Sequence, residues 1–102
     1  MIARIWHGRT KATDFETYTD FLRKVAIPDY QNTEGFVRLS FLRRLEGDVS
    51  HFTLITIWEN QEVIQNFGGS DFEKAKYYPE DDNFLLEFEE KVTFYEVFAE
   101  RP

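Results

Sequence analysis

The chain has 102 residues, 42% of them hydrophobic and 30% charged, and this balance is typical of one folded domain and excludes wholesale disorder. It contains no cysteine, which excludes disulfides and thiol nucleophiles and is consistent with the cytoplasmic location that we expect. The formal net charge of −7 disfavours nucleic acid and anionic membranes as partners, and no apolar run approaches the ~18 residues of a membrane span.

The first third of the chain predicts a strand followed by a helix. Ile2–Thr10 is a short β-prone segment that ends in a turn. Thr13 and Glu16 have the spacing of a capping box, and apolar residues then recur at helical intervals, so a helix should begin near this point. Because proline disfavours the α conformation in the residue before it, this helix should end before Pro28.

The middle of the chain predicts a β-hairpin. Apolar and polar side chains alternate along Phe36–Glu46, which places Val37 and Leu39 on the same face. Gly47 lies in a tight-turn signal, and the β-branched segment Val49–Glu59 follows it. Two β-prone segments joined by such a turn are typical of antiparallel neighbours.

Two short helices are predicted after the hairpin. Asn60 can cap the first of them, which should end at Gly68 because glycine favours helix termini. The spacing of Ser70 and Glu73 indicates a second capping box, and we expect a short helix there that Pro79 stops. An acidic loop should follow.

The order of these elements predicts the fold class. KVTFYEVFA, at residues 91–99, is the last β-prone segment, so the order is β-α-β-β-α-β. This is the ferredoxin-like α+β plan, a single domain over residues 1–102. Right-handed crossovers give an antiparallel sheet with strand order 4-1-3-2 and both helices on one face.

The predicted sheet carries large apolar side chains on both faces. Phe52 and Leu54 share one side of the third strand, whereas Ile55 and Ile57 share the other. Helices cover only one face, and a bare apolar sheet face of several hundred Å² is rarely left in water. We therefore expect a homodimer in which a second copy packs sheet against sheet about a two-fold axis.

Four stretches carry a resemblance to a known family: MIARIWHGRT in the first strand, LITIWENQEVIQNF from the third strand into the second helix, AKYYPEDDNFLLE, and VTFYEV in the last strand. Together they cover nearly the whole chain, and it resembles the antibiotic-biosynthesis-monooxygenase-like group of dimeric α+β barrels. The passage from Ile57 to Asn60 is the most widely shared of these features. The resemblance implies a homodimer, often with a pocket between the sheet and the second helix.

The same resemblance implies several activities. The group includes cofactor-independent oxygenases of aromatic polyketides, haem-degrading enzymes and an isomerase. Haem-degrading relatives use an asparagine, a tryptophan and a histidine at positions that fall near His7, Phe67 and Tyr77 here, and none of the three matches. We therefore expect no haem and no other cofactor.

The candidate catalytic residues are His7, Tyr77 and Tyr78. His7 is our candidate base, because histidine transfers protons near neutral pH. One of the two tyrosines should point inward, where its hydroxyl can donate to a ligand oxygen or to a backbone partner. The pocket walls are predicted from Trp58, Phe67 and Phe72.

Two alternatives remain open for other polar residues. His7 and His51 come close in the predicted sheet, and with Asp48 they would form a metal-ligand set, but we favour two partly exposed histidines and no metal. Arg4 shares a strand face with Trp6 and is expected to pair with a carboxylate, either of its own chain or across the dimer.

Two functions from different classes fit this sequence. The first is a cofactor-independent monooxygenase, or related enzyme, acting on a small aromatic or enolisable substrate. The second is a non-catalytic dimer that binds a small ligand or acts in a stress response. An open cavity that reaches His7 favours the first function, and a cavity filled by aromatic rings favours the second.

Overall fold

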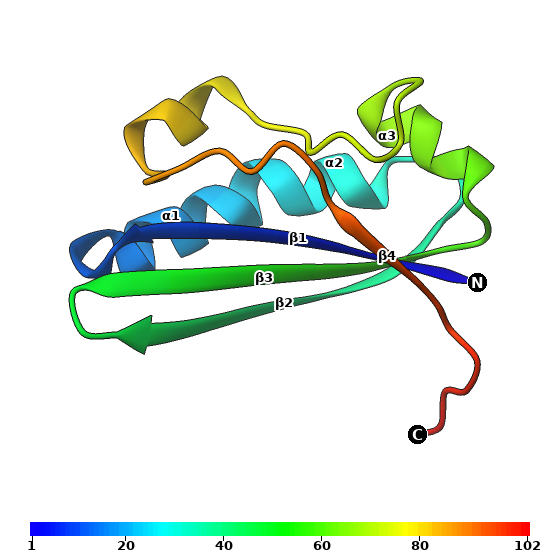
Figure 1. Cartoon of the computed structure of the whole chain (residues 1–102), viewed down its shortest axis with the longest axis horizontal. Coiled ribbons are helices and arrows are strands. Elements are labelled where there is room, and N and C mark those ends of the chain that lie inside the picture. The colour runs from blue at the N-terminus through cyan, green and yellow to red at the C-terminus, as the bar shows by residue number, and fades with distance from the viewer.

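Four antiparallel strands form one sheet with a helical layer on a single face, and the computed structural model describes residues 1–102 (Figure 1). The strand order is β2-β3-β1-β4, which is the predicted order read from the other edge, so the α+β prediction is confirmed. No helix is long and apolar enough to cross a membrane. The strands are β1 (Ile2–Lys11), β2 (Phe36–Glu46), β3 (Val49–Trp58) and β4 (Thr93–Glu96).

The first helical segment continues past the proline that was predicted to stop it. It consists of a 3-10 turn (Ala12–Asp14), α1 (Phe15–Phe21), a π-helical turn (Leu22–Ala26) and α2 (Ile27–Gln31). In a regular α-helix the ring of Pro28 would clash with the carbonyl four residues earlier. The wider π turn directly before α2 accommodates the proline, so the prediction that the helix ends there is wrong.

The capping box predicted at the start of this segment does not form. No side-chain capping hydrogen bond is present at the beginning of α1. The Glu16 carboxylate instead accepts a hydrogen bond from Arg43 Nη1 at 3.0 Å, which fixes α1 against the edge strand β2. A tertiary ion pair has replaced the local cap.

The second helical segment is short, and an irregular strap follows it. Asn60 Oδ1 accepts a hydrogen bond from the Val63 N–H at 3.1 Å, as predicted. A 3-10 turn (Glu62–Ile64) and α3 (Gln65–Gly68) follow, and Gly69 ends the helix with φ 91°. Residues 69–78, which we call the strap, contain no helix.

The predicted second capping box is therefore wrong. Glu73 pairs with Lys91 at 3.6 Å, and the strap backbone bridges to the chain ahead of β4 instead of coiling into a helix. Pro79 begins a 3-10 turn (Pro79–Asn83), because its missing N–H is harmless in a first helical turn. β4 covers only Thr93–Glu96 of the predicted strand at residues 91–99.

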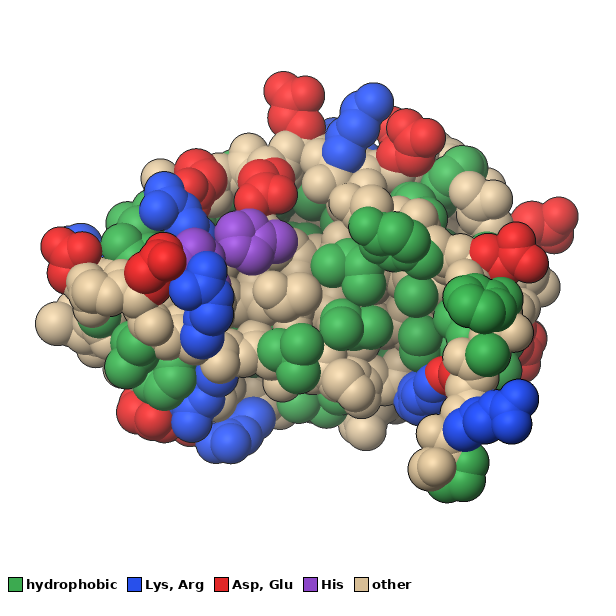
Figure 2. Space-filling view, turned by 60° about the horizontal axis from the view of Figure 1, so that its bottom comes forward, with side chains coloured by type: hydrophobic (Ala, Val, Ile, Leu, Met, Phe, Trp, Pro, Cys, Tyr) green, Lys and Arg blue, Asp and Glu red, His purple; other side chains and the backbone are tan.

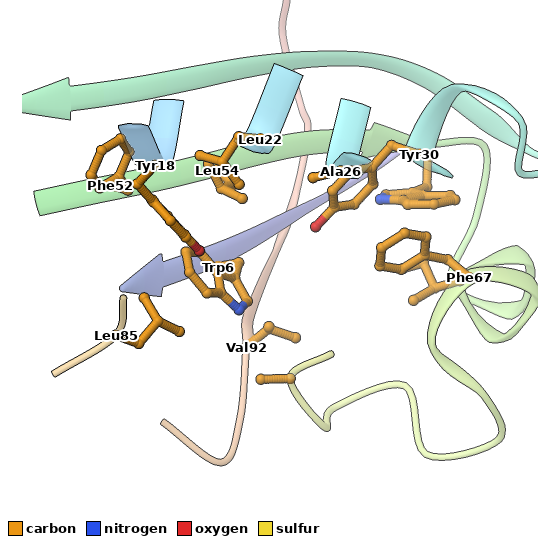
Figure 3. Packing of buried hydrophobic residues seen from close by; sticks show 13 residues of the cluster. Trp6, Tyr18, Leu22, Ala26, Tyr30, Phe52, Leu54, Phe67, Leu85 and Val92 are labelled. Carbon is orange, nitrogen blue, oxygen red and sulfur yellow. The ribbon is translucent and has the colours of Figure 1, made fainter. Parts of the chain in front are cut away.

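The core lies between the sheet and the helical layer and is rich in aromatic side chains (Figure 3). Trp58 is fully buried, and Tyr30 stacks on Phe67 with ring centroids 4.1 Å apart. Trp6 lies beside Leu85 and Val92, from the segments that approach the end of the sheet. Core-facing side chains of β1 and β3 occupy even positions, as the alternation predicts.

The opposite face of the sheet has no helical cover. Ile5 and Ile55 are paired across β1 and β3, and Leu42 and Tyr95 extend this apolar surface onto the two edge strands. Tyr95 is 61% exposed and Leu42 51% exposed. Figure 2 shows apolar side chains gathered over the middle of this face, which we call the open face. The prediction of apolar groups on both faces is confirmed.

One residue of the hairpin was assigned to the wrong environment. The pairing of β2 with β3 shifts register between Phe36 and Arg38, which is the signature of a β-bulge. This bulge leaves Val37 exposed, whereas Leu39 packs against the core as predicted.

A glycine in β1 provides the first test of this packing. A Cβ atom on Gly8 would fall 2.9 Å from Trp6 Cζ3 and 3.1 Å from Leu85 Cδ2. We expect Gly8→Ala to lower the free energy of unfolding by about 1–3 kcal/mol, because the indole must move within a filled core. Gly68→Ala, where a Cβ atom would meet nothing within 4 Å, should change it by less than about 0.5 kcal/mol in the same urea titration. Equal effects of the two substitutions would contradict the close approach of Trp6.

Candidate functional site

A cationic side chain is buried between the sheet and the helices. Arg4 on β1 is 1% exposed, and its Nη1 atom donates to the Tyr30 hydroxyl at 3.0 Å. Its Nε atom has no hydrogen-bond partner, and Arg4 forms no ion pair with a carboxylate. Arg4 therefore has no carboxylate partner in its own chain, and a pair with a carboxylate across the dimer stays a prediction.

A carboxylate is buried in the acidic turn that begins at Pro79. Asp81 is 1% exposed; its Oδ1 accepts from the Tyr18 hydroxyl at 2.7 Å and its Oδ2 from the Tyr78 N–H at 2.8 Å. Burial raises the pKa of Asp81, although these two hydrogen bonds oppose the shift. Burial and the Asp81 carboxylate together raise the pKa of the Tyr18 phenol. Asp81 also caps the turn that begins at Pro79.

The strap is tied to the first helical segment through one aspartate. Asp29 Oδ2 accepts from Lys76 Nζ at 2.8 Å and from the Tyr78 hydroxyl at 2.7 Å. Burial alone would raise the pKa of Asp29, but these hydrogen bonds outweigh it and lower the pKa. The Lys76 ammonium also lies 4.1 Å from the centroid of the Phe67 ring.

These groups surround a small cavity, which we call the inner site. Its volume is about 10 Å³, room for roughly one water molecule. Trp6 Nε1, like Arg4 Nε, is buried and has no hydrogen-bond partner. Trp6 lines the inner site, whereas Arg4 does not line it and connects to it through Tyr30, which accepts from Arg4 Nη1 and is a lining residue. The residues that line the cavity are Trp6, Tyr18, Leu22, Ala26, Tyr30, Leu54, Lys76, Tyr78 and Asp81.

The predicted catalytic residues do not form one constellation. Tyr78 lines the inner site, whereas His7 lies on the open face, where its Nδ1 atom is 2.7 Å from Glu89 Oε2. Tyr77 contacts residues near both of these places. Its ring meets Trp6 of the inner site edge-on, with centroids 6.0 Å apart, and its hydroxyl donates at 2.5 Å to the carbonyl of Glu89, the residue that bonds His7. Burial raises the pKa of Tyr77 to about 12. The catalytic roles of all three residues stay predictions.

The three predicted wall residues have different surroundings. Phe67 stacks on Tyr30 below Arg4, whose guanidinium carbon is 5.3 Å from the centroid of the Phe67 ring. Trp58 packs against Phe67, with ring centroids 5.9 Å apart, and does not line the inner site. Phe72 packs edge-on against Phe94 and does not line the inner site.

Several residues of the site were missed by the sequence reasoning. Asp81 was assigned to a solvated acidic loop, and no signal in the sequence distinguishes it from its exposed neighbours Glu80 and Asp82. Arg4 was placed on the correct face beside Trp6, and the strand alternation could have marked it as a buried charge. The contact of His7 with Glu89 joins residues 82 positions apart, which no local pattern predicts.

Comparison with solved structures identifies the fold as that of the antibiotic-biosynthesis-monooxygenase-like proteins, so the predicted resemblance is confirmed at the level of the fold. A variant of MhuD, solved with two manganese protoporphyrin IX molecules per active site, matches with a TM-score of 0.65 and 14% identity. The match covers 100% of this chain and 99% of that chain.

A second solved structure has the same fold. An antibiotic-biosynthesis-monooxygenase-like protein from Bacillus cereus matches with a TM-score of 0.60 and 15% identity, over 99% of this chain and 96% of that one. No protein-family profile and no curated protein sequence matches the chain. At these identities the likeness shows the fold alone.

The pH dependence of stability tests how Asp29 holds the strap. Because the pKa of Asp29 is lower in the folded than in the unfolded chain, its stabilisation is present above about pH 4 and is lost as the pH falls through the folded pKa. We expect Asp29→Asn to be less stable than the wild type at pH 7 and to approach it toward pH 2.5. Urea titrations across this range measure the convergence. Asp20→Asn, which removes an exposed helical carboxylate, is the control. If the free energy of unfolding of Asp29→Asn ran parallel to that of the wild type across this pH range, Asp29 would not hold the strap through its ionised carboxylate.

Proposed function

We propose that the chain is a monooxygenase-like homodimer that binds a small aromatic or enolisable molecule in the inner site. The observation that carries this proposal is the Arg4 guanidinium, which is buried without a carboxylate. The monooxygenase-like fold supports the class of activity. The cytoplasmic location expected from the sequence remains part of the proposal.

The energetics of Arg4 favour a ligand with an anionic oxygen. A charge removed from water is costly unless a counter-charge and hydrogen bonds offset its desolvation. Arg4 has only a neutral phenol as partner, and its free Nε lies in the same core as the free Trp6 N–H. An enolate, phenolate or carboxylate oxygen would accept from such donors, as oxyanions do in acyl-transfer sites.

The reaction that fits such a ligand is oxygenation without a cofactor. A base removes a proton from an acidic CH₂ group, and the enolate that forms, stabilised by Arg4, transfers one electron to O₂. The substrate radical and superoxide combine to a peroxide, which loses water to leave a carbonyl, so that CH₂ and O₂ become C=O and H₂O. Asp81 is a candidate base inside the inner site, and His7 remains the predicted one. Tyr77 and Tyr78 remain the predicted donors.

Ligand entry requires displacement of the strap. The inner site holds about 10 Å³ of free space, far less than the roughly 300 Å³ or more of typical ligand pockets. Lys76 and Tyr78 line the cavity and both hydrogen-bond to Asp29, so breaking these two contacts would open the cavity on the side of the strap. The filled interior is also the specific observation that favours the second candidate function, a non-catalytic binding or stress-response module.

The homodimer is the second part of the proposal. The open face combines Ile5, Ile55 and Leu42 with the exposed ring of Tyr95, and no helix or strand of this chain covers it. A second copy has the same apolar centre, so a two-fold axis through this face buries both copies at once. Phe98, 94% exposed beyond β4, would add to the buried surface.

A substitution at Arg4 tests the inner site. We expect an anthrone-type substrate to quench tryptophan fluorescence, because Trp6 lines the cavity, and to consume O₂ in an oxygen-electrode assay. Arg4→Met should weaken binding by about 10- to 100-fold, the value of a charge-assisted hydrogen bond, while thermal stability is kept or raised. Arg4→Lys, which keeps the charge, should retain part of the binding.

The controls separate the two functions. Arg9→Met removes a guanidinium from the open face and should leave binding unchanged. Binding without O₂ uptake would support the non-catalytic module, and an Arg4→Met variant that binds as tightly as the wild type would refute the site. Loss of turnover in Asp81→Asn but not in His7→Ala assigns the base to Asp81, and the reverse assigns it to His7.

Self-association is tested at the centre of the open face. We expect sedimentation equilibrium to give twice the mass of one chain, and Ile55→Glu to give a folded monomer, because two buried carboxylates would face each other across the two-fold axis. Leu45→Glu, an equally apolar residue at the hairpin tip and off the open face, should remain dimeric. A wild-type chain that sediments as a monomer at micromolar concentration would refute the dimer.

A further inference from the structure

Two histidines on the open face present ring nitrogens to each other. His7 on β1 and His51 on β3 are diagonal neighbours, since the residue directly opposite His51 is Arg9. His7 Nε2 lies 3.3 Å from His51 Nδ1, and the ring centroids are 5.6 Å apart. The pair lies past the end of β4, whose pairing with β1 stops at Ile5, so no strand covers it on that side.

The outer nitrogen of each ring is bound to a carboxylate. His7 Nδ1 lies 2.7 Å from Glu89 Oε2, and His51 Nε2 lies 3.0 Å from Glu46 Oε1. An ionised carboxylate can only accept, so each outer nitrogen must carry the proton of its neutral ring. The two inner nitrogens then face each other as lone pairs. Two nitrogens at this distance are joined either by a proton on one of the rings or by a metal ion that both rings bind.

The separation of these nitrogens matches that of two ligands on one metal ion. In a tetrahedral site with metal–nitrogen bonds of about 2.0–2.1 Å, two ligand nitrogens lie about 3.3–3.4 Å apart. A histidine that binds a metal also commonly donates its other N–H to a carboxylate, and this fixes its tautomer and ring orientation. Both histidines have such a carboxylate.

We propose that His7 Nε2 and His51 Nδ1 bind one divalent transition-metal ion, with Cu²⁺ and Zn²⁺ the best fits to imidazole ligands. No third histidine, aspartate or glutamate of this chain completes the set, so water fills the remaining positions. Glu46 and Glu89 bond the outer nitrogens, and neither ring hydrogen-bonds to Asp48, the residue that the sequence offered as a third ligand. The side chains are 34% and 16% exposed, which leaves the ion a path from solvent.

The local charge also suits a cation. Glu87 lies beside Glu89 and pairs with Arg9, and Glu46 pairs with Arg44 at 3.4 Å. Three carboxylates therefore surround the histidines against two guanidinium groups. This site shares His7 with the proposed function, but it lies on the other face of the sheet from Arg4, and its readout is metal binding instead of turnover.

Calorimetric titration of untagged protein with Cu²⁺ and with Zn²⁺ tests the proposal. We expect one ion per chain, an electron paramagnetic resonance spectrum of Cu²⁺ with two imidazole nitrogens, and at least a tenfold loss of affinity in His7→Ala and in His51→Ala. Glu89→Ala should weaken metal binding by about 10- to 100-fold, the usual effect of removing a carboxylate that hydrogen-bonds to a metal-binding histidine. Asp48→Ala removes the same charge from the hairpin turn and should leave the affinity unchanged.

Three results would overturn the site. Histidine variants that bind Cu²⁺ as tightly as the wild type would place the ion elsewhere. A wild-type chain that binds neither ion, with ¹⁵N NMR showing a proton on an inner nitrogen, would mean that a shared proton joins the rings instead. Equal losses of metal affinity in Glu89→Ala and Asp48→Ala would mean that any nearby negative charge helps binding, and not the bond between Glu89 and His7. His7→Gln replaces His7→Ala if circular dichroism shows that the alanine variant is unfolded.

Discussion

The burial of one guanidinium without a counter-charge is the constraint on which this account depends. Arg4 is the third residue of β1 and is buried against Tyr30 and Phe67, where water cannot solvate it. A hydrophobic residue of the same length would fill this position without a desolvation penalty. The presence of an arginine in this well-packed core is explained if an anionic group of a ligand lies next to it during function. The strap, through Lys76 and Tyr78, then closes the site when no ligand is bound.

The alternation of β1 separates two kinds of chemistry. Even-numbered residues of this strand, among them Arg4 and Trp6, enter the aromatic core, whereas Ile5 and His7 project onto the open face. The inner site and the histidine pair therefore lie back to back, separated by the thickness of one sheet. His7 therefore lies on the other face of the sheet from Tyr78, which lines the inner site. A dimer formed through the open face would bring the histidine pair close to the partner copy.

The sheet was predictable because its signals are local. Alternation along β2 and β3, a glycine in the hairpin turn and the crossover rule together gave the strand order, and the aromatic content gave a core on one face and an apolar surface on the other. The bulge at Val37 was not predicted, because one inserted residue shifts the alternation of apolar and polar side chains without changing the composition of the strand. The helix was shortened in the prediction because Pro28 was treated as a stop, although a π turn before it removes the clash.

The strap and the site were not predictable for a different reason. A capping-box spacing at Ser70 and Glu73 competes with tertiary contacts to Lys91 and to Asp29, and the tertiary contacts win. The hydrogen bonds that build the inner site join residues such as Tyr18 and Asp81, 63 positions apart. Hydrophobic periodicity shows that such residues are buried, but not which polar groups meet.

The most direct measurement is a crystal structure, at a resolution that shows ordered water, of the protein purified from its native source. The account predicts density for a small non-protein molecule with an oxygen within hydrogen-bond distance of Arg4 Nε, and a strap displaced from Asp29. A structure in which Arg4 instead bonds a carboxylate of its own chain, or turns outward to solvent, would contradict it.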